Sequence, residues 1–293
     1  MVSPLIQCNF YNKLAIVMRV GATVLVFDIE TVPDVAGLRR LEDYPATLSD
    51  AEVAQLAMAA RTVKTGSDFL PLYLQRIVAI SCVIRRTTKE GLPQLKVGSL
   101  GDIGDVEKTL IQAFYDLVEK YTPQLVSWNG SGFDLPVLHY RAMVQQVQAA
   151  RYWEMGESQD SDSRDFKWNN YISRYHLRHL DMMDILAKFN PRANAPLDGL
   201  AKLCGFPGKM GMDGSQVWGA YQEGRLPEIR SYCETDVVNT YLMYCRFQLM
   251  RGGFSAAEYA EELRFVRAYL EGEAKQVHGA TWQEYLAGFT DAA

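Results

Sequence analysis

The stretch Thr23–Thr31 constrains the fold of this chain more than any other segment. Its sequence, TVLVFDIET, is a run of β-branched and aromatic residues that predicts a buried strand. Since side chains alternate between the two faces of a strand, Asp28 and Glu30 share one face and Phe27 points to the other. Two buried carboxylates cost several kcal/mol unless a cation neutralises them, and a divalent metal is the simplest such cation. Alternatively, the strand ends at Ile29, with Glu30 in a solvated loop and Asp28 as a capping residue.

The composition is that of a globular protein. A chain of 293 residues with 48% hydrophobic residues can bury a large core. Its longest apolar runs have the length of strands, whereas a membrane helix needs ~20 residues, so we expect no membrane span. Five cysteines without a C-x-x-C pair suit reduced thiols in the cytoplasm and no zinc site. A net charge of −5 does not indicate a nucleic-acid binder, but acids around a metal can lower the total while a local basic rim contacts phosphates.

The order of apolar segments predicts an α/β layered fold. Three strands in succession imply antiparallel neighbours, after which helices and strands alternate. The expected strands cover residues 23–31, 76–84, 94–100, 124–128 and a fifth near 180–186 that runs into a helix. The expected helices cover residues 48–61, 105–121, 135–147, 197–204, 215–222 and 227–249.

Two further regions are less regular. Residues 150–178 are polar, aromatic and weakly periodic, and we expect a long loop with one strand-like or helical piece, lying over the site. The tail contains two capping boxes, Ser255-x-x-Glu258 and Thr281-x-x-Glu284, which predict two helix starts.

The turn from Asn129 to Asp134 is a second candidate for chemistry, because it follows a strand and precedes a helix. In open α/β sheets, ligands bind beyond the carboxyl ends of strands. Asp134 is also well placed to be the N-cap of a helix with Pro136 in its first turn. The residues therefore leave a binding role and a capping role open.

The late helix 227–249 carries the third candidate. Asp236 lies one turn after Tyr232 on the same apolar stripe. An acid on the core face of a helix needs a partner, which is either a metal or a nearby cation such as Arg230; alternatively, Asp236 lies solvated at the edge of the stripe.

Together the three motifs, Asp-x-Glu on a strand, Asn-x-x-x-Phe-Asp at a turn and Tyr-x-x-x-Asp on a helix, closely resemble those of the DEDD superfamily of 3′→5′ exonucleases. The sequence is most similar to the stand-alone bacterial proteins that resemble the exonuclease domain of family B DNA polymerases. The resemblance implies a ribonuclease H-like α/β fold, with a mixed five-stranded sheet and helices on both faces, and it covers roughly residues 24–251. With the helical tail that the capping boxes predict, the chain divides into an N-terminal arm (1–20), an exonuclease domain (21–252) and a C-terminal helical extension (253–293). No segment resembles a polymerase palm.

The resemblance also implies site residues and cofactors. The implied catalytic residues are Asp28, Glu30, Asp134, Tyr232 and Asp236. The four acids would bind two divalent cations, Mg²⁺ or Mn²⁺, about 3.5–4 Å apart across the scissile phosphate. Ser231 occupies the position at which the histidine branch of the superfamily has its His, so Tyr232 indicates the tyrosine branch. A phenol with a pKa near ~10 is a poor base at neutral pH, and we therefore expect Tyr232 to orient the attacking water.

Thr31, Asn129 and Phe133 are the expected substrate-binding residues, which contact the terminal nucleotide through hydrogen bonds and stacking. Trp128 is either a core residue or a further binding residue. Asp181 and Asp184 are expected to be structural, at a strand end or an N-cap, rather than metal ligands. Arg76, Arg85, Arg86, Lys202 and Lys209 are either contacts for the nucleic-acid backbone or ordinary surface charges.

The sequence therefore predicts a metal-dependent 3′→5′ exonuclease that removes nucleoside 5′-monophosphates from single-stranded DNA or from DNA 3′ termini, in repair or end trimming. An exonuclease of the same chemistry acting on RNA is the nearest alternative, since sugar discrimination depends on a few contacts near the terminal ribose. A catalytically inactive nucleic-acid-binding protein is the second alternative. The sequence does not determine the oligomeric state.

Overall fold

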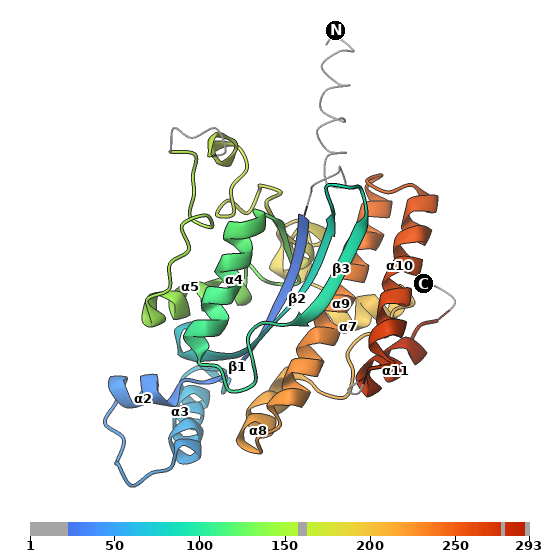
Figure 1. Ribbon diagram of the computed structural model, residues 1–293. Coiled ribbons are helices and arrows are strands. Elements are labelled where there is room, and N and C mark those ends of the chain that lie inside the picture. Colours follow the sequence, from blue (N-terminus) through green and yellow to red (C-terminus); the bar gives the residue numbers. More distant parts are fainter. Residues whose placement is uncertain (1–22, 158–162, 277–278, 291–293) are drawn as a thin grey trace.

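The computed structural model describes residues 23–157, 163–276 and 279–290. The expected N-terminal arm, residues 1–20, lies outside the described residues. Within these ranges, five strands form one mixed sheet in the order β3-β2-β1-β4-β5 (Figure 1). The strands are β1 (Thr23–Pro33), β2 (Gln75–Thr87), β3 (Pro93–Ser99), β4 (Gln124–Ser127) and β5 (His179–Asp181). The five expected strands and the α/β class are confirmed.

The central strand of the sheet is β1. It pairs antiparallel with β2, which in turn pairs antiparallel with β3, as expected of three successive strands. It pairs in parallel with β4 only from Val24 to Val26, because β4 ends at Ser127. Beyond Val26, the edge of β1 that faces away from β2 is therefore open to side chains.

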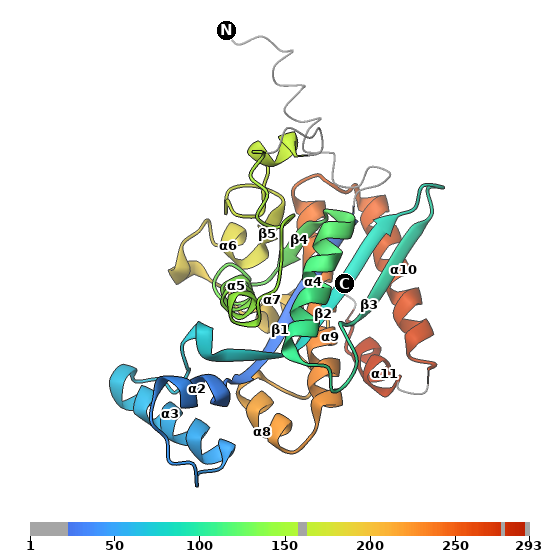
Figure 2. The same cartoon turned by 60° about the vertical axis from the view of Figure 1, so that its left-hand side comes forward.

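Helices cover both faces of the sheet, as the resemblance implied (Figures 1 and 2). On one face, Leu25, Phe27 and Ile29 pack with apolar residues of α4 (Glu107–Tyr121) and α5 (Asp134–Gln145). On the other face, Val24 and Val26 pack against α9 (Leu226–Met250). The alternation predicted for β1 is thus observed, and the strand is buried on both sides.

The remaining helices agree largely with the expected ranges. They are α3 (Asp50–Thr65), α6 (Met182–Leu186), α7 (Leu197–Leu203) and α8 (Val217–Gln222). Ser49 and Glu52 form a capping box at the start of α3. The short helix α2 (Val35–Leu41) was not expected; its N-cap is Asp34, which accepts a hydrogen bond from Gly37 N. Short 3₁₀ turns lie at Leu72–Leu74, Arg164–Lys167, Pro191–Ala193 and Gly214–Gln216.

The C-terminal tail forms α10 (Ala256–Glu273) and α11 (Ala280–Ala287), which pack on the α9 side of the sheet (Figure 1). Ser255 and Glu258 form the expected capping box of α10. The second expected capping box is wrong, because α11 begins at Ala280 and places Thr281 inside its first turn. Among the described residues, no helix has both the length and the apolar character that crossing a membrane requires.

The position predicted for residues 150–178 is also wrong. Tyr152, Phe166 and Tyr171 are buried in the core with α4 and α5, and the rings of Tyr152 and Tyr171 stack with centroids 5.3 Å apart. The described part of this segment contains the one short helical piece that was expected, but none of its residues lines the cavity beside the acids. Tyr152, Phe166 and Tyr171 thus bury apolar area, whereas Trp168 and Tyr175 are exposed and lie outside the lining of that cavity.

Candidate active site

Asp28 and Glu30 lie together on the face of β1 that packs against α9. Their carboxylate oxygens and the Sγ atom of Cys233 on α9 lie within 4.8 Å of one another. Cys233 Sγ is 3.6 Å from the Asp28 carboxylate. Glu30 is buried rather than in a solvated loop, since β1 continues to Pro33. The prediction that the two acids share a buried face is confirmed, whereas the thiol beside them was not expected.

A β-bulge follows Glu30, where the pairing of β1 with β2 shifts register before Thr31. Strict alternation would point Thr31 to the face opposite to Glu30, but both residues line one cavity. Bulges re-aim side chains in this way. The hydroxyl of Thr31 is held by a 3.1 Å hydrogen bond to the amide oxygen of Gln75 on β2.

Asp134 joins the acids from α5. Phe133 is the N-cap of α5 and Asp134 is its first helical residue, so the capping alternative for Asp134 is wrong. One carboxylate oxygen of Asp134 accepts a 3.1 Å hydrogen bond from Ile29 N, at the edge of β1 left open by the end of β4. This bond places the Asp134 carboxylate beside the strand that carries the other two acids.

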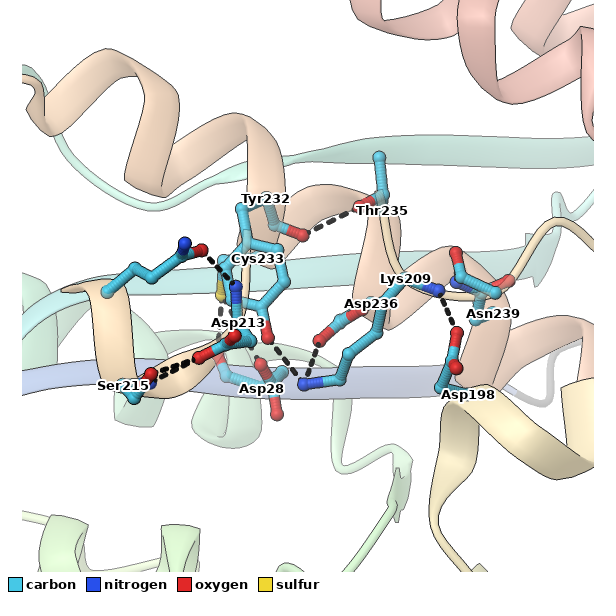
Figure 3. A network of polar contacts seen from close by, with 12 residues as sticks. Asp28, Asp198, Lys209, Asp213, Ser215, Tyr232, Cys233, Thr235, Asp236 and Asn239 are labelled. Carbon is cyan, nitrogen blue, oxygen red and sulfur yellow. Dashed lines mark hydrogen bonds and ion pairs between the residues drawn. The ribbon is translucent and has the colours of Figure 1, made fainter. Parts of the chain in front are cut away.

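Asp236 and Tyr232 approach from α9, and Lys209 lies between them (Figure 3). The ammonium of Lys209 donates to Tyr232 Oη at 2.5 Å and lies 3.5 Å from a carboxylate oxygen of Asp236. The other oxygen of Asp236 is buried and has no hydrogen-bond partner among the described residues. Arg230 is not the partner of Asp236, because its guanidinium donates to the carbonyls of Ser99 and Gly101.

Burial disfavours the ionised form of all four acids, and Lys209 acts in the opposite direction on Asp28, Glu30 and Asp236. Burial, followed by repulsion from neighbouring carboxylates, raises the pKa of Asp28 well above its ordinary value, and burial is also the largest cause for Glu30. Burial raises the pKa of Asp134 to about 7 and raises that of Asp236. Burial and the nearby carboxylates also raise the pKa of Tyr232, so this phenol stays protonated at neutral pH.

The three expected substrate residues meet in one cavity. Thr31, Asn129 and Phe133 line a space of about 600 Å³ that also touches Glu30. The turn that carries Asn129 is fixed by Asp181, whose carboxylate accepts hydrogen bonds from Asn129 N and Ser131 N. Gly132 lies so close to the Asn129 side chain that an added Cβ would be 2.5 Å from its oxygen.

The expected N-cap role is confirmed for Asp181, whereas Asp184 lies inside α6 and is neither an N-cap nor at a strand end. Asp181 is the N-cap of α6 and accepts hydrogen bonds from Met183 N and Asp184 N. Asp184 forms an ion pair with Arg174 at 2.6 Å. The indole of Trp128, which is partly buried in the core, donates to the carbonyl of Ala195.

Among the expected surface cations, two differ from the prediction. Arg85 is buried and forms an ion pair of two hydrogen bonds with Glu262 of α10. It is therefore neither a surface charge nor a contact for the nucleic-acid backbone. Lys209 is part of the acid cluster. Phe69, from the loop before β2, lines the cavity and lies with its ring centroid 5.9 Å from that of Phe133. Nothing in the hydrophobic periodicity distinguishes Phe69, because it lies in a loop.

The comparison with known protein families agrees with this geometry. Residues 67–289 match the family described as predicted 3′-5′ exonucleases related to the exonuclease domain of PolB. The chain belongs to this family. The matched range contains Asp134, Tyr232 and Asp236 and continues through α11, whereas Asp28 and Glu30 precede it. No curated protein matches the chain.

Divalent cations, which exonucleases of this kind normally use, fit the donor atoms of the cluster. Four carboxylates, of which those of Glu30, Asp134 and Asp236 are buried and that of Asp28 is half-buried, supply the oxygen ligands that Mg²⁺ and Mn²⁺ prefer. The buried Asp236 oxygen without a hydrogen-bond partner is an available ligand atom. Cys233 Sγ adds a softer donor at the edge of the same cluster.

Proposed function

We propose that this protein is a metal-dependent 3′→5′ exonuclease that hydrolyses phosphodiester bonds at the 3′ ends of single-stranded DNA. The observation that carries the proposal is the convergence of four acids and one tyrosine, from β1, α5 and α9, beside a cavity lined by Thr31, Asn129 and Phe133. The family description supports the exonuclease class. The tyrosine-branch assignment, the single-stranded DNA substrate and the two-cation mechanism are parts of this proposal.

In this proposal, Asp28, Glu30, Asp134 and Asp236 would hold the two divalent cations. When bound, such cations lower the pKa of a coordinated water and stabilise the charge on the phosphate. The unsatisfied oxygen of Asp236 and the raised pKa values of the four carboxyls support this assignment, because a cation would remove both penalties.

Tyr232 and Lys209 act on the water and the phosphate as hydrogen-bond donors. Because Lys209 donates to Tyr232 Oη, the phenol keeps its own O–H for a second acceptor. With its pKa raised, Tyr232 does not remove a proton, and it orients the attacking water. The ammonium of Lys209 lies close enough to the acids to stabilise negative charge that develops on the phosphate.

The cavity of about 600 Å³ would receive the terminal nucleotide. Phe133 and Phe69 offer aromatic faces on which any base can stack, which suits an enzyme that removes nucleotides regardless of sequence. Thr31 and Asn129 would provide hydrogen bonds to the sugar. Within the part of the chain that the structure describes, the cysteines are free thiols, which supports the cytoplasm as the proposed location.

The test is digestion of single strands labelled at the 5′ end, with Mg²⁺ or Mn²⁺, by the wild type and by Asp28→Ala. We expect a ladder of products that shortens from the 3′ end with the wild type and intact strands with the variant. A matched RNA strand and a blunt DNA duplex, assayed side by side, compare the proposed substrate with the alternatives. Faster digestion of RNA would favour the exoribonuclease, and binding without cleavage would favour an inactive binding protein.

A further inference from the structure

The C-terminal helix α11 is connected to the acid cluster by two buried hydrogen bonds. Tyr285 Oη donates to Asn239 Oδ1 at 2.8 Å, and Asn239 Nδ2 donates to the carbonyl of Gly208 at 2.7 Å. The side chains of Tyr285 and Asn239 are both fully buried. Gly208 directly precedes Lys209, whose ammonium contacts Tyr232. A tail residue is thus two hydrogen bonds away from the backbone beside Lys209.

The tail contacts the segment 205–208 at three further points. Thr290 N donates to the carbonyl of Gly205 at 3.0 Å, and the ring of Phe289 lies 6.2 Å from that of Phe206. Gly288 packs against Pro207 so closely that an added Cβ would be 2.8 Å from the proline ring. Gly205, Phe206 and Pro207 therefore each contact the residues that follow α11, while Gly208 is reached through Asn239.

The other end of the connection is helix α9, which carries Tyr232, Asp236 and Asn239 (Figure 3). Asn239 donates a hydrogen bond to the carbonyl of Gly208, the residue before Lys209. Tyr232 and Asp236 contact the ammonium of Lys209. Lys209 N also donates to the Asp198 carboxylate at 2.7 Å. Both ends of Lys209 are thus held, and the Asn239 amide is the link that depends on the tail.

We propose that Tyr285 is a positioning residue for the exonuclease reaction, which holds Lys209 against Tyr232 and Asp236 through Asn239 and Gly208. This inference rests on the proposed function. Without the Tyr285 hydroxyl, the buried Asn239 oxygen loses its donor, and the amide is no longer fixed in the orientation that holds Gly208. The consequence falls on turnover rather than on substrate affinity, because Tyr285, Asn239, Gly208 and Lys209 do not line the cavity.

The test compares Tyr285→Phe with Tyr244→Phe. Tyr244 is an equally buried tyrosine on α9, but its hydroxyl bonds to Gln124 Oε1, away from Lys209. We expect Tyr285→Phe to lower kcat on single-stranded DNA by roughly tenfold with KM unchanged, since misplacing a catalytic group by about 1 Å can cost up to ~100-fold. Tyr244→Phe is expected to keep the wild-type kcat. Thermal melting of both variants checks that they are folded.

The double variant Tyr285→Phe with Lys209→Met separates positioning from general loosening of the fold. If Tyr285 acts through Lys209, its substitution adds no further loss of kcat once the ammonium is gone. An equal loss in both backgrounds, or an unchanged kcat in Tyr285→Phe, would overturn the inference while leaving the proposed function intact. If Tyr285→Phe melts below the assay temperature, Phe289→Leu repeats the same comparison through the contact with Phe206. A wild type that digests no strand would overturn the proposed function and this inference together.

Discussion

At the scale of single residues, the site combines groups that cannot all be charged at once. Tyr232 is a buried phenol near Asp236, Glu30 and Asp28, and burial followed by these carboxylates raises its pKa, which favours the protonated phenol at neutral pH. A protonated phenol acts through its position and its hydrogen bonds. This distinguishes Tyr232 from the acids, which we propose to bind the cations.

Replacing Tyr232 by Phe removes one hydroxyl and no charge. We expect this variant to bind Mn²⁺ as tightly as the wild type and to lose roughly 100-fold in kcat, because the water is no longer oriented. Asp28→Ala is expected to lose both cation binding and turnover. Calorimetric titration with Mn²⁺ and single-turnover digestion measure the two properties separately. A Tyr232→Phe variant with the wild-type rate would show that the phenol has no part in the reaction.

Lys209 permits a second prediction at this scale. Lys209→Met keeps most of the side-chain length and removes the ammonium that contacts Tyr232 and Asp236. We expect kcat to fall by at least about tenfold, as for the loss of an electrostatic donor to a developing negative charge. Lys108→Met is the matched control, because Lys108 is exposed on α4. Equal effects of the two substitutions on kcat would argue against a direct role for Lys209.

At the scale of elements, the loop between α3 and β2 contributes one wall of the cavity. Its Phe69 is half exposed and contacts Phe133, so Phe69→Ala removes a stacking surface without opening the core. We expect this variant to raise the Kd for single-stranded DNA by roughly 5- to 100-fold, since stacking on an aromatic ring contributes about 1–3 kcal/mol. Trp168→Ala, at an exposed aromatic residue outside the cavity, serves as the control in the same fluorescence-anisotropy titration. Unchanged affinity in Phe69→Ala would remove the loop from the binding site.

The attachment of α10 to the sheet rests on a buried ion pair. Arg85 on β2 donates two hydrogen bonds of 2.8 Å to Glu262, which also accepts one from Tyr241 on α9. Glu262→Ala leaves the Arg85 charge buried without its partner, and we expect the free energy of unfolding to fall by about 3–5 kcal/mol. Urea denaturation measures this, with Glu261→Ala on the exposed side of the same helix as the control. A loss below about 1 kcal/mol would show that α10 is held mainly by its apolar contacts.

At the scale of the whole molecule, the acid cluster makes stability depend on pH and on cations. In EDTA, the folded protein keeps protons on carboxyls whose pKa is raised, such as Asp134 with a pKa of about 7, whereas the unfolded chain releases them near pH 4. The folded state therefore binds more protons than the unfolded state in this interval. Its free energy of unfolding must fall as the pH rises through 7.

We expect the free energy of unfolding in EDTA to fall by a few kcal/mol between pH 6.5 and 8.5, since one pKa unit corresponds to about 1.4 kcal/mol. The interval begins at pH 6.5 because of His179, whose pKa burial lowers to about 4. Below pH 6.5 this histidine makes the free energy of unfolding rise with pH, which opposes the effect of the carboxyls. Urea denaturation at the two pH values, with and without Mn²⁺, measures the effect. Saturating Mn²⁺ should abolish the fall, and Asp134→Asn should reduce it in EDTA. A free energy of unfolding that rises with pH in EDTA over this interval would contradict the raised pKa values of the clustered carboxyls.

The sequence by itself determined much of the fold and most of the candidate site. Alternation along Thr23–Thr31 predicted which face carries the acids, and the spacing of Asp134, Tyr232 and Asp236 indicated the family. These are local signals, because strand and helix periodicities repeat every 2.0 and 3.6 residues. The capping box of α10 is equally local and was predicted for the same reason.

Only the tertiary structure decided what surrounds the acids. The partner of Asp134 is Ile29, 105 residues earlier in the chain, and Lys209 reaches Tyr232 from a loop without periodicity. The charge of Arg85 suggested a surface residue until its partner on α10, 177 residues later, was known. A lone Lys, Phe or Cys looks the same in the sequence whether it faces solvent or a carboxylate. The sequence thus identified the acids, and the fold determined the lysine, the thiol and the tail helix that accompany them, because contacts between distant segments leave no periodic pattern in the chain.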